Sequence, residues 1–474
     1  MEWKNEAITY KDLFLSFIQT TYIRTLDIRQ RSGEHASLYL EAVLHSEIEE
    51  NDLHGIGETM TLLYVQEGEI KPLFYGVIDE ISTKKDGDSR ILFLEAWDAT
   101  RLMDTEKRFR AFQNPAMKVK ELVDEVMKTY PGCDYKLHIP NVSIGQLLMQ
   151  YGETDWEFLK RIFSKYYAPV YPDPAFDAVR LQMGESKMTE DWNWDAYPFE
   201  LFQNFEELNA RKENGFAELS CAQTVQYQVE SYDIASLGSQ VCYKGNSWYI
   251  KEVKRTLKDG LLVSQYRLSQ KEAMKILPYF NEKLTGISVD GQIVAVARDK
   301  VQVEMELDAG SGDPYWFPFS TVASSSDGSG WYCMPEIGES VRVYFPVDDE
   351  KEAYVVTNIK AHEPQQGTVS APMDNPKVRT IETAQGNQVQ FTEEGVLLAT
   401  GSGEGKILLK KTGEILLDAK KDIVISAGEA INIVASNELV MKSQTSIKIA
   451  NETGAEVELK KGRIRLHGMT IHEN

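Results

Sequence analysis

The sequence contains little cysteine, and what it has is not arranged for chemistry. Its four cysteines, Cys133, Cys221, Cys242 and Cys333, lie far apart and form no CxxC pair. This spacing argues against a zinc site and against a disulfide framework. A disulfide between Cys221 and Cys242 stays open in case their strands adjoin, although we expect reduced, buried thiols.

Long apolar runs and a basic N-terminus are also missing. No stretch of about eighteen apolar residues occurs, so the sequence predicts no transmembrane helix. The N-terminus has no basic region followed by an apolar stretch, so no secretory signal is expected. We therefore expect the protein to be made in the cytoplasm.

Positive charge is scarce relative to negative charge. The chain has 51 basic and 73 acidic residues, a formal net charge of −22. A nucleic acid or an anionic lipid surface would be repelled by such a chain, so neither is an expected partner. With 42% hydrophobic residues over 474 positions, the chain can still bury several domain cores.

Aromatic residues and proline are absent from the C-terminal part. No Phe, Trp or Tyr follows Phe391, and no proline follows Pro376. Residues 385–474 hold twelve acidic and eleven basic residues, so the negative excess lies upstream. Two different kinds of structure therefore share this chain.

Residues 1–280 read as a mainly β domain with some α-helix. Asp86-Gly87 and Asp259-Gly260 each separate two strand-like runs, which predicts two tight β-hairpins. One helix is predicted over about 116–130. A second helix should start at Thr154, which forms a capping box with Glu157.

Residues 281–360 predict a compact all-β unit. About five short alternating runs, including Lys300 to Leu307 and Val341 to Phe345, suit a small closed barrel such as an OB-fold. Residues 361–384 are rich in proline and polar residues and are expected to form a linker.

Residues 385–474 carry the strongest pattern in the sequence. Apolar residues recur as i, i+2 pairs whose first members are spaced by eight through six units. Such a pair points to one side of a short strand. The pairs are Ile407/Leu409, Ile415/Leu417, Ile423/Ile425, Ile431/Ile433, Leu439/Met441 and Ile447/Ile449.

Eight residues are too few for one turn of a single-chain β-helix around a filled core, but they can cover one side of a prism. Three chains winding together would close such a prism, and these twelve residues would then line its axis. The absence of aromatic residues fits a narrow axis. An ordinary antiparallel meander with accidental spacing is the alternative.

Two further segments, together with the octads, resemble the spike proteins of contractile tails. These include the VgrG family of type VI secretion and the hub and spike proteins of contractile phages. Residues 149–162 (MQYGETDWEFLKRI) are similar to the family's Gln-Tyr-x-Glu-x-Asp-aromatic segment. Trp316, Gly330-Trp331 and residues 335–345 (PEIGESVRVYF) resemble the spike OB-fold. The octads resemble its triple-stranded needle.

The resemblance implies a hub over 1–280 built of β-barrel-like subdomains with helices, an OB-fold over 281–360 and a trimeric intertwined β-helix over 385–474. It implies a homotrimer that docks a tail-tube protein and baseplate proteins, with a tip protein of the Pro-Ala-Ala-Arg class as a further partner. Such a spike is assembled in the cytoplasm, joins a phage tail, tailocin or secretion apparatus, and meets a target membrane only transiently on contraction.

Two other functions stay open from the sequence, a spike-borne cell-wall hydrolase and a static trimeric adhesin or tail fibre. No catalytic site is predicted. The segment Gly401 to Lys406 lacks phosphate-loop spacing and precedes a strand. Glu153 and Asp155 lie at a helix N-terminus, where negative charge is stabilised without any catalytic role.

No cofactor is expected, and one metal site is considered. In some needles of this family a His-x-His binds an ion at the tip. Here the spacing departs from that pattern, with His467 and His472 five residues apart. His472 is therefore a weak candidate for a tip metal ligand, and a solvated histidine is the simpler interpretation.

Overall fold

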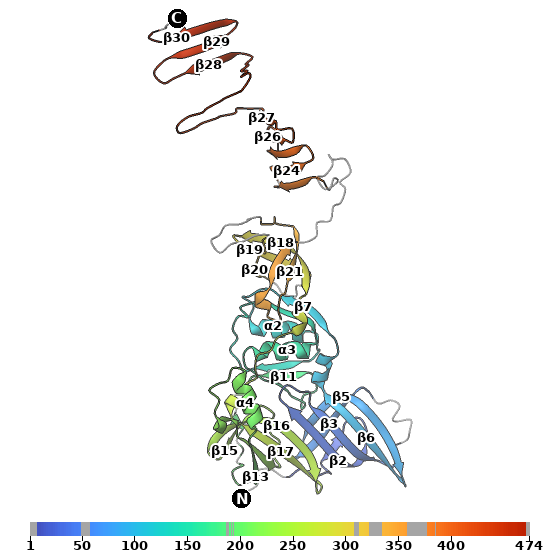
Figure 1. The fold of residues 1–474 in the computed structure, drawn as a ribbon. Coiled ribbons are helices and arrows are strands. Elements are labelled where there is room, and N and C mark those ends of the chain that lie inside the picture. Colours follow the sequence, from blue (N-terminus) through green and yellow to red (C-terminus); the bar gives the residue numbers. More distant parts are fainter. Residues whose placement is uncertain are drawn as a thin grey trace. The chain divides into compact units, whose positions relative to one another are not determined.

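The computed structural model describes residues 7–48, 57–185, 189–190, 192, 194–307, 312–321, 334–357, 377–383 and 385–470. The chain forms two compact units, Met1–Ile359 and Lys360–Asn474 (Figure 1). Among the described helices, none is both long and apolar enough to cross a bilayer.

The N-terminal part of the first unit is built on a twelve-stranded sheet. Strands such as β3 alternate buried and half-buried residues, so one face packs on a core and the other is partly open to solvent. The path runs β1-β4-β5-β6-β3-β2-β16-β17-β14-β13, with β15 and β12 beside β16. The bounds are β1 Leu13–Leu15, β2 Thr20–Arg31, β3 Ser37–Leu44, β4 Thr59–Gln66, β5 Glu69–Asp86, β6 Ser89–Asp98, β12 Thr189–Glu190, β13 Phe199–Phe202, β14 Gln226–Ser231, β15 Gln240–Tyr243, β16 Asn246–Lys258 and β17 Leu261–Ser269.

Both predicted hairpins of this sheet are confirmed. Strands β16 and β17 are joined by Asp259 and Gly260, whose φ angles of 52° and 77° give the left-handed conformation of a type I′ turn. Strands β5 and β6 turn at Gly87, which has a φ of 62°.

A helical layer follows in the chain. The predicted helices are α2 (Val119–Met127) and α3 (Asp155–Ser164). The capping box is confirmed, since the Thr154 hydroxyl accepts from the Glu157 N–H at 3.1 Å and Glu157 accepts from the Thr154 N–H at 3.0 Å. Around the helices lie η1 (Ala99–Asp104), the pair β7 (Arg108–Phe112) and β9 (Leu148–Glu153), and the sheet of β8 (Asp134–Leu137), β10 (Val170–Pro172) and β11 (Arg180–Met183).

Short helices that the sequence did not single out include α4 (Phe205–Glu213), η2 (Cys221–Thr224) and α5 (Lys271–Met274). Cys133, Cys221 and Cys242 are free thiols, so the Cys221–Cys242 disulfide does not form here, and the two exposed thiols are not buried as expected. Cys333 lies outside the described residues.

The predicted five-stranded barrel is present. Its sheet order is β20-β19-β18-β21-β22, preceded by η3 (Glu282–Leu284). The barrel closes where Phe319 bridges Val355 and the Ser320 N–H donates to the Val355 carbonyl at 2.8 Å. The bounds are β18 Ser288–Ala297, β19 Lys300–Met305, β20 Trp316–Pro318, β21 Ser340–Tyr344, η4 Glu350–Glu352 and β22 Tyr354–Thr357.

The second unit contains two antiparallel meanders. The first runs β23 (Arg379–Glu382), β24 (Gln388–Thr392), β25 (Gly395–Ala399), β26 (Gly405–Lys410) and β27 (Ile415–Ala419), and the second runs β28 (Ser446–Ala450), β29 (Glu456–Lys460) and β30 (Arg463–His467). Strand β23 lies inside the predicted linker 361–384, and its Ile381 pairs with Val389. The end of the predicted linker is therefore β-strand.

The octads that begin at 423, 431 and 439 form no strands in this single chain, so the expectation of six consecutive strands is corrected. A strand requires a neighbour that accepts its backbone hydrogen bonds. Residues 421–445 have no such neighbour among the described residues.

Candidate interaction surface

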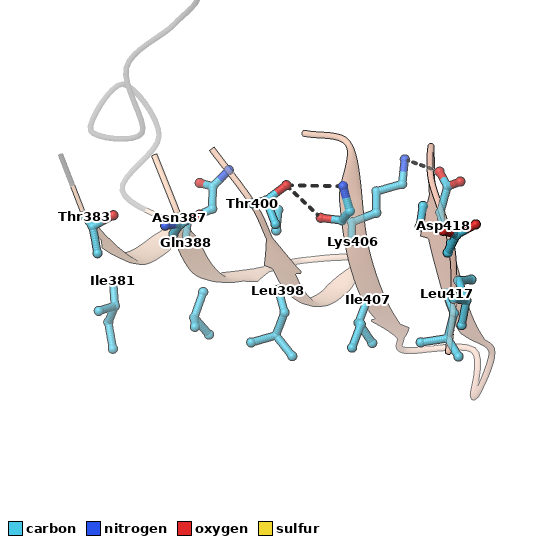
Figure 2. A pocket seen from close by; sticks show the side chains of 16 residues that line it. Ile381, Thr383, Asn387, Gln388, Leu398, Thr400, Lys406, Ile407, Leu417 and Asp418 are labelled. Carbon is cyan, nitrogen blue, oxygen red and sulfur yellow. Dashed lines mark hydrogen bonds and ion pairs between the residues drawn. The ribbon is translucent and has the colours of Figure 1, made fainter. Parts of the chain in front are cut away.

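One face of the β23–β27 sheet carries a continuous apolar row. The register aligns one residue from each strand, in the order Ile381, Val389, Leu398, Ile407 and Leu417. Figure 2 shows the labelled members of this row pointing to the same side of the sheet.

A second apolar row runs beside the first. Residues two positions away in a strand share its face, and the register aligns Phe391, Val396, Leu409 and Ile415. The opposite face carries polar pairs, including Lys406 and Asp418, whose charged atoms are 3.2 Å apart (Figure 2). We call the two apolar rows together the apolar face of the β23–β27 sheet.

The β28–β30 sheet repeats this arrangement. Its register aligns Ile447 with Leu459 and Leu459 with Ile464 on one face. On the strands' other face, Lys448 pairs with Glu458 in register and its ammonium lies 2.6 Å from the Glu456 carboxylate. The β28–β30 sheet is therefore apolar on one face and charged on the other, whereas the polar face of the β23–β27 sheet also carries the aligned leucines Leu397, Leu408 and Leu416.

Nothing in the described chain covers these apolar faces. Of the twelve residues expected at the trimer axis, eleven are exposed and Ile447 is half-buried. Ile415 is 70% exposed and Leu417 51%. Because burying a large aliphatic side chain is worth about 1.5–3 kcal/mol, such faces favour a partner that covers them.

The structure brings together some of the predicted axis residues and not others. Ile407, Leu409, Ile415 and Leu417 meet on one sheet face, and Ile447 and Ile449 lie on another. The remaining six are between 50% and 64% exposed in a segment without regular structure; they are Ile423, Ile425, Ile431, Ile433, Leu439 and Met441.

A second notable site joins the helical layer to the barrel, and the sequence did not predict it. Arg161 of α3 donates from Nη1 to Glu350 Oε1 of η4 at 2.7 Å and from Nε to Glu153 Oε1 at 2.7 Å. The Met149 carbonyl accepts from Nη2 at 2.7 Å. Lys165 donates to the other Glu350 oxygen at 2.9 Å. We call this set the Arg161 network.

The Arg161 network is closed to solvent at its centre. The side chains of Arg161 and Glu350 are both fully buried. Burial alone would raise the pKa of Glu350, but Arg161 and Lys165 hold that pKa below its ordinary value. The carboxylate therefore stays charged and ties the barrel to the helix.

The motif that carries the family resemblance builds these contacts. Glu153 is held by Arg161 as described, and Asp155 is fully buried against Arg108 and Arg110. Gln150 donates to Asp155 at 3.0 Å. Glu153 thus pairs with the buried Arg161, and the buried Asp155 pairs with two half-buried arginines, so both carboxylates have charged partners.

The other candidate sites give little chemistry. Of the segment Gly401 to Lys406, residues 401–404 form the turn between β25 and β26 and the last two residues begin β26, with the Thr400 N–H donating to the Gly405 carbonyl at 3.0 Å. His467 ends β30 and is exposed, whereas His472 lies outside the described residues. Within the described part of the chain, no three His, Cys, Asp or Glu side chains gather as a metal site would require.

A known protein family matches the barrel. Residues 289–359 match the model of the type VI secretion system/phage-baseplate injector OB domain. The barrel belongs to that family. No curated protein sequence matches the chain.

Solved structures are similar to this chain beyond the barrel. The lidded PdpA–VgrG complex of Francisella is similar over 84% of this chain and 76% of that chain, with 8% identity and a TM-score of 0.53. Its lidless form covers 83% of this chain and 93% of that chain, with 9% identity and a TM-score of 0.50. An Escherichia coli type VI secretion component matches 72% of this chain and 98% of its own at 12% identity, with a TM-score of 0.48.

The family match confirms the predicted OB domain, and the predicted mainly β fold is similar to that of a VgrG. The signals that carried this prediction were the Pro-Glu-x-Gly string before β21 and the segment around α3. The Arg161 network was missed because its two halves lie 189 residues apart in sequence.

Proposed function

We propose that three copies of this VgrG-like chain wind residues 385–474 into an intertwined β-prism, which serves as the needle of a contractile injection machine. The uncovered apolar face of the β23–β27 sheet is the observation that carries this proposal. Two further copies would cover that face and would supply strand partners for residues 421–445.

The remaining parts of the chain have mechanical roles in this proposal. The hub, residues 1–280, docks the tail tube and the baseplate, and the OB domain, residues 281–360, connects to it. The network of Arg161 and Glu350 supports this division, because it would pass axial load from barrel to helix without a flexible joint. A small tip protein of the Pro-Ala-Ala-Arg class would cap the needle.

Assembly in the cytoplasm and delivery outward on sheath contraction follow from this role. The similar Francisella VgrG was solved in complex with PdpA, which supports a comparable complex with a baseplate or effector protein here. The role is structural, and no residue is proposed to catalyse a reaction.

Sedimentation of the full chain tests the proposal. At micromolar concentration the protein should sediment as a trimer, and removal of residues 385–474 should yield a monomer or a weaker assembly. A wild type that remains monomeric would end the needle model.

Turnover of peptidoglycan by the purified trimer would instead support the hydrolase alternative. A stable trimer that recovers neither tube nor baseplate protein in a pull-down would favour the adhesin.

A further inference from the structure

The twelve-stranded sheet of the first unit ends at a short strand whose outer edge is not paired among the described residues. Strand β13 is last in the sheet order and pairs only with β14 among the described residues. Its Leu201 is 56% exposed and its Phe199 45%. An exposed apolar edge strand is a template for pairing with another chain, and proteins usually block such edges with charge or proline.

A groove of about 640 Å³ lies over this end of the sheet, with residues of β13, β14 and β17 in its lining. The residues that line it include Tyr197, Tyr232 and the acidic residues Glu200, Glu230 and Asp259. Its only basic residue is Lys258, which lies 3.5 Å from Glu230. The groove therefore combines apolar rings with a net negative charge.

On the opposite face of β13, the ring of Phe199 already holds a cation. The Lys244 ammonium lies 3.3 Å from the centroid of Phe199 and 5.1 Å from that of Tyr227. A cation above an aromatic face is attracted by the ring quadrupole. This ring is therefore already occupied, and the attraction of the groove for lysine or arginine side chains comes from its carboxylates.

From this arrangement we propose that a basic, extended segment of a partner protein binds at this end of the sheet. The surface consists of the β13 edge, with Phe199 and Glu200, and the neighbouring groove residues Glu230 and Asp259. The segment would add a strand to β13, and its lysine or arginine side chains would enter the groove. The net charge of −22 would steer such a segment toward the chain. This surface is separate from the apolar faces of residues 385–470.

Fluorescence anisotropy with the full chain and a labelled acetyl-(Arg-Val)3-amide peptide tests the proposal. Wild type should bind this peptide more tightly than acetyl-(Arg-Pro)3-amide, which has the same charge but cannot form a full strand ladder. Each of Glu200→Gln and Asp259→Asn should weaken binding by about two- to fivefold. Glu213→Gln, an exposed site at the end of α4, should leave the affinity unchanged.

Equal affinity for the two peptides, or wild-type affinity in the Glu200→Gln/Asp259→Asn variant, would overturn the proposal. A smaller assembly on Leu201→Lys substitution would also overturn it, because a second copy would then be the occupant of β13. None of these results depends on the needle, whose trimer is tested by removing residues 385–474.

Discussion

The guanidinium of Arg161 and the carboxylate of Glu350 meet at 2.7 Å with no exposure to solvent, although they belong to a helix and a barrel. Removing one member of a buried ion pair leaves the other charged and unpaired. The loss then includes the desolvation of that charge as well as the lost attraction. This pair therefore makes the two parts of the first unit interdependent.

Arg161→Met should reduce the stability of the first unit by about 3–5 kcal/mol, because Glu350 and Glu153 would both lose their main partner. Urea unfolding followed by tryptophan fluorescence measures this loss. All eight tryptophans lie in the first unit, so their signal reports on that unit alone.

Arg342→Met is the matched control. Arg342 lies 2.8 Å from Asp290 on the barrel, but the two side chains are 44% and 49% exposed. Such a pair is worth at most about 1 kcal/mol. Equal losses for Arg161→Met and Arg342→Met would show that burial does not distinguish the two pairs.

Asp98→Asn should change the pH dependence of stability. Asp98 is buried and accepts from the Ala36 N–H at 2.9 Å and from the Thr100 hydroxyl at 2.9 Å. Burial raises its pKa from 3.8 to about 7. The native state therefore holds this proton more tightly than the unfolded chain, and Asp98 costs stability as pH rises from about 4 to 7.

The asparagine variant lacks this titration, so its stability relative to wild type should increase between pH 5 and pH 8, by up to a few kcal/mol. Urea midpoints at both pH values measure the change. Asp88→Asn, in an exposed hairpin turn, supplies the comparison. A difference between Asp98→Asn and wild type that is the same at both pH values would contradict the raised pKa.

Gly395→Ala should loosen the sheet of the second unit. Gly395 has a φ of 148°, and a Cβ there would lie 1.9 Å from the Leu409 carbonyl oxygen. Strand β25 would have to move away from β26. Faster amide hydrogen exchange across both strands is the expected result.

Gly428→Ala is a suitable control for this change, since a Cβ at Gly428 meets nothing within 4 Å and its φ is not positive. Unchanged exchange in β25 and β26 of the Gly395→Ala protein would mean that the close approach to Leu409 is not kept in solution.

Local patterns in the sequence predicted much of this fold, for identifiable reasons. The Asp259-Gly260 turn and the Thr154 capping box act over a few residues, so their signals are complete within the local sequence. The octads likewise predicted which residues share a sheet face, because Leu409 and Ile415 are joined through one turn.

Two features could not be predicted in the same way. The contact of Arg161 with Glu350 depends on how two distant elements pack, which no local spacing encodes. The octads between 421 and 445 carry the same apolar pairs as their neighbours but form no strand in one chain. In the proposed trimer, their strands would pair with partner chains, which a single sequence does not display.

Ile431→Asp tests that dependence directly. Ile431 is 50% exposed in the single chain and has no strand partner among the described residues. In the proposed prism, three copies of the aspartate would meet on a dry axis, where burial of an unpaired charge costs several kcal/mol per ion. Like charges cannot neutralise one another, so the trimer should lose heat resistance while the tryptophan-monitored unfolding of the first unit stays unchanged. Asn432→Asp adds the same charge one position along, where the side chain would point away from the axis, and should leave the trimer intact. If the Ile431→Asp trimer withstands heat as well as wild type does, Ile431 does not face the axis.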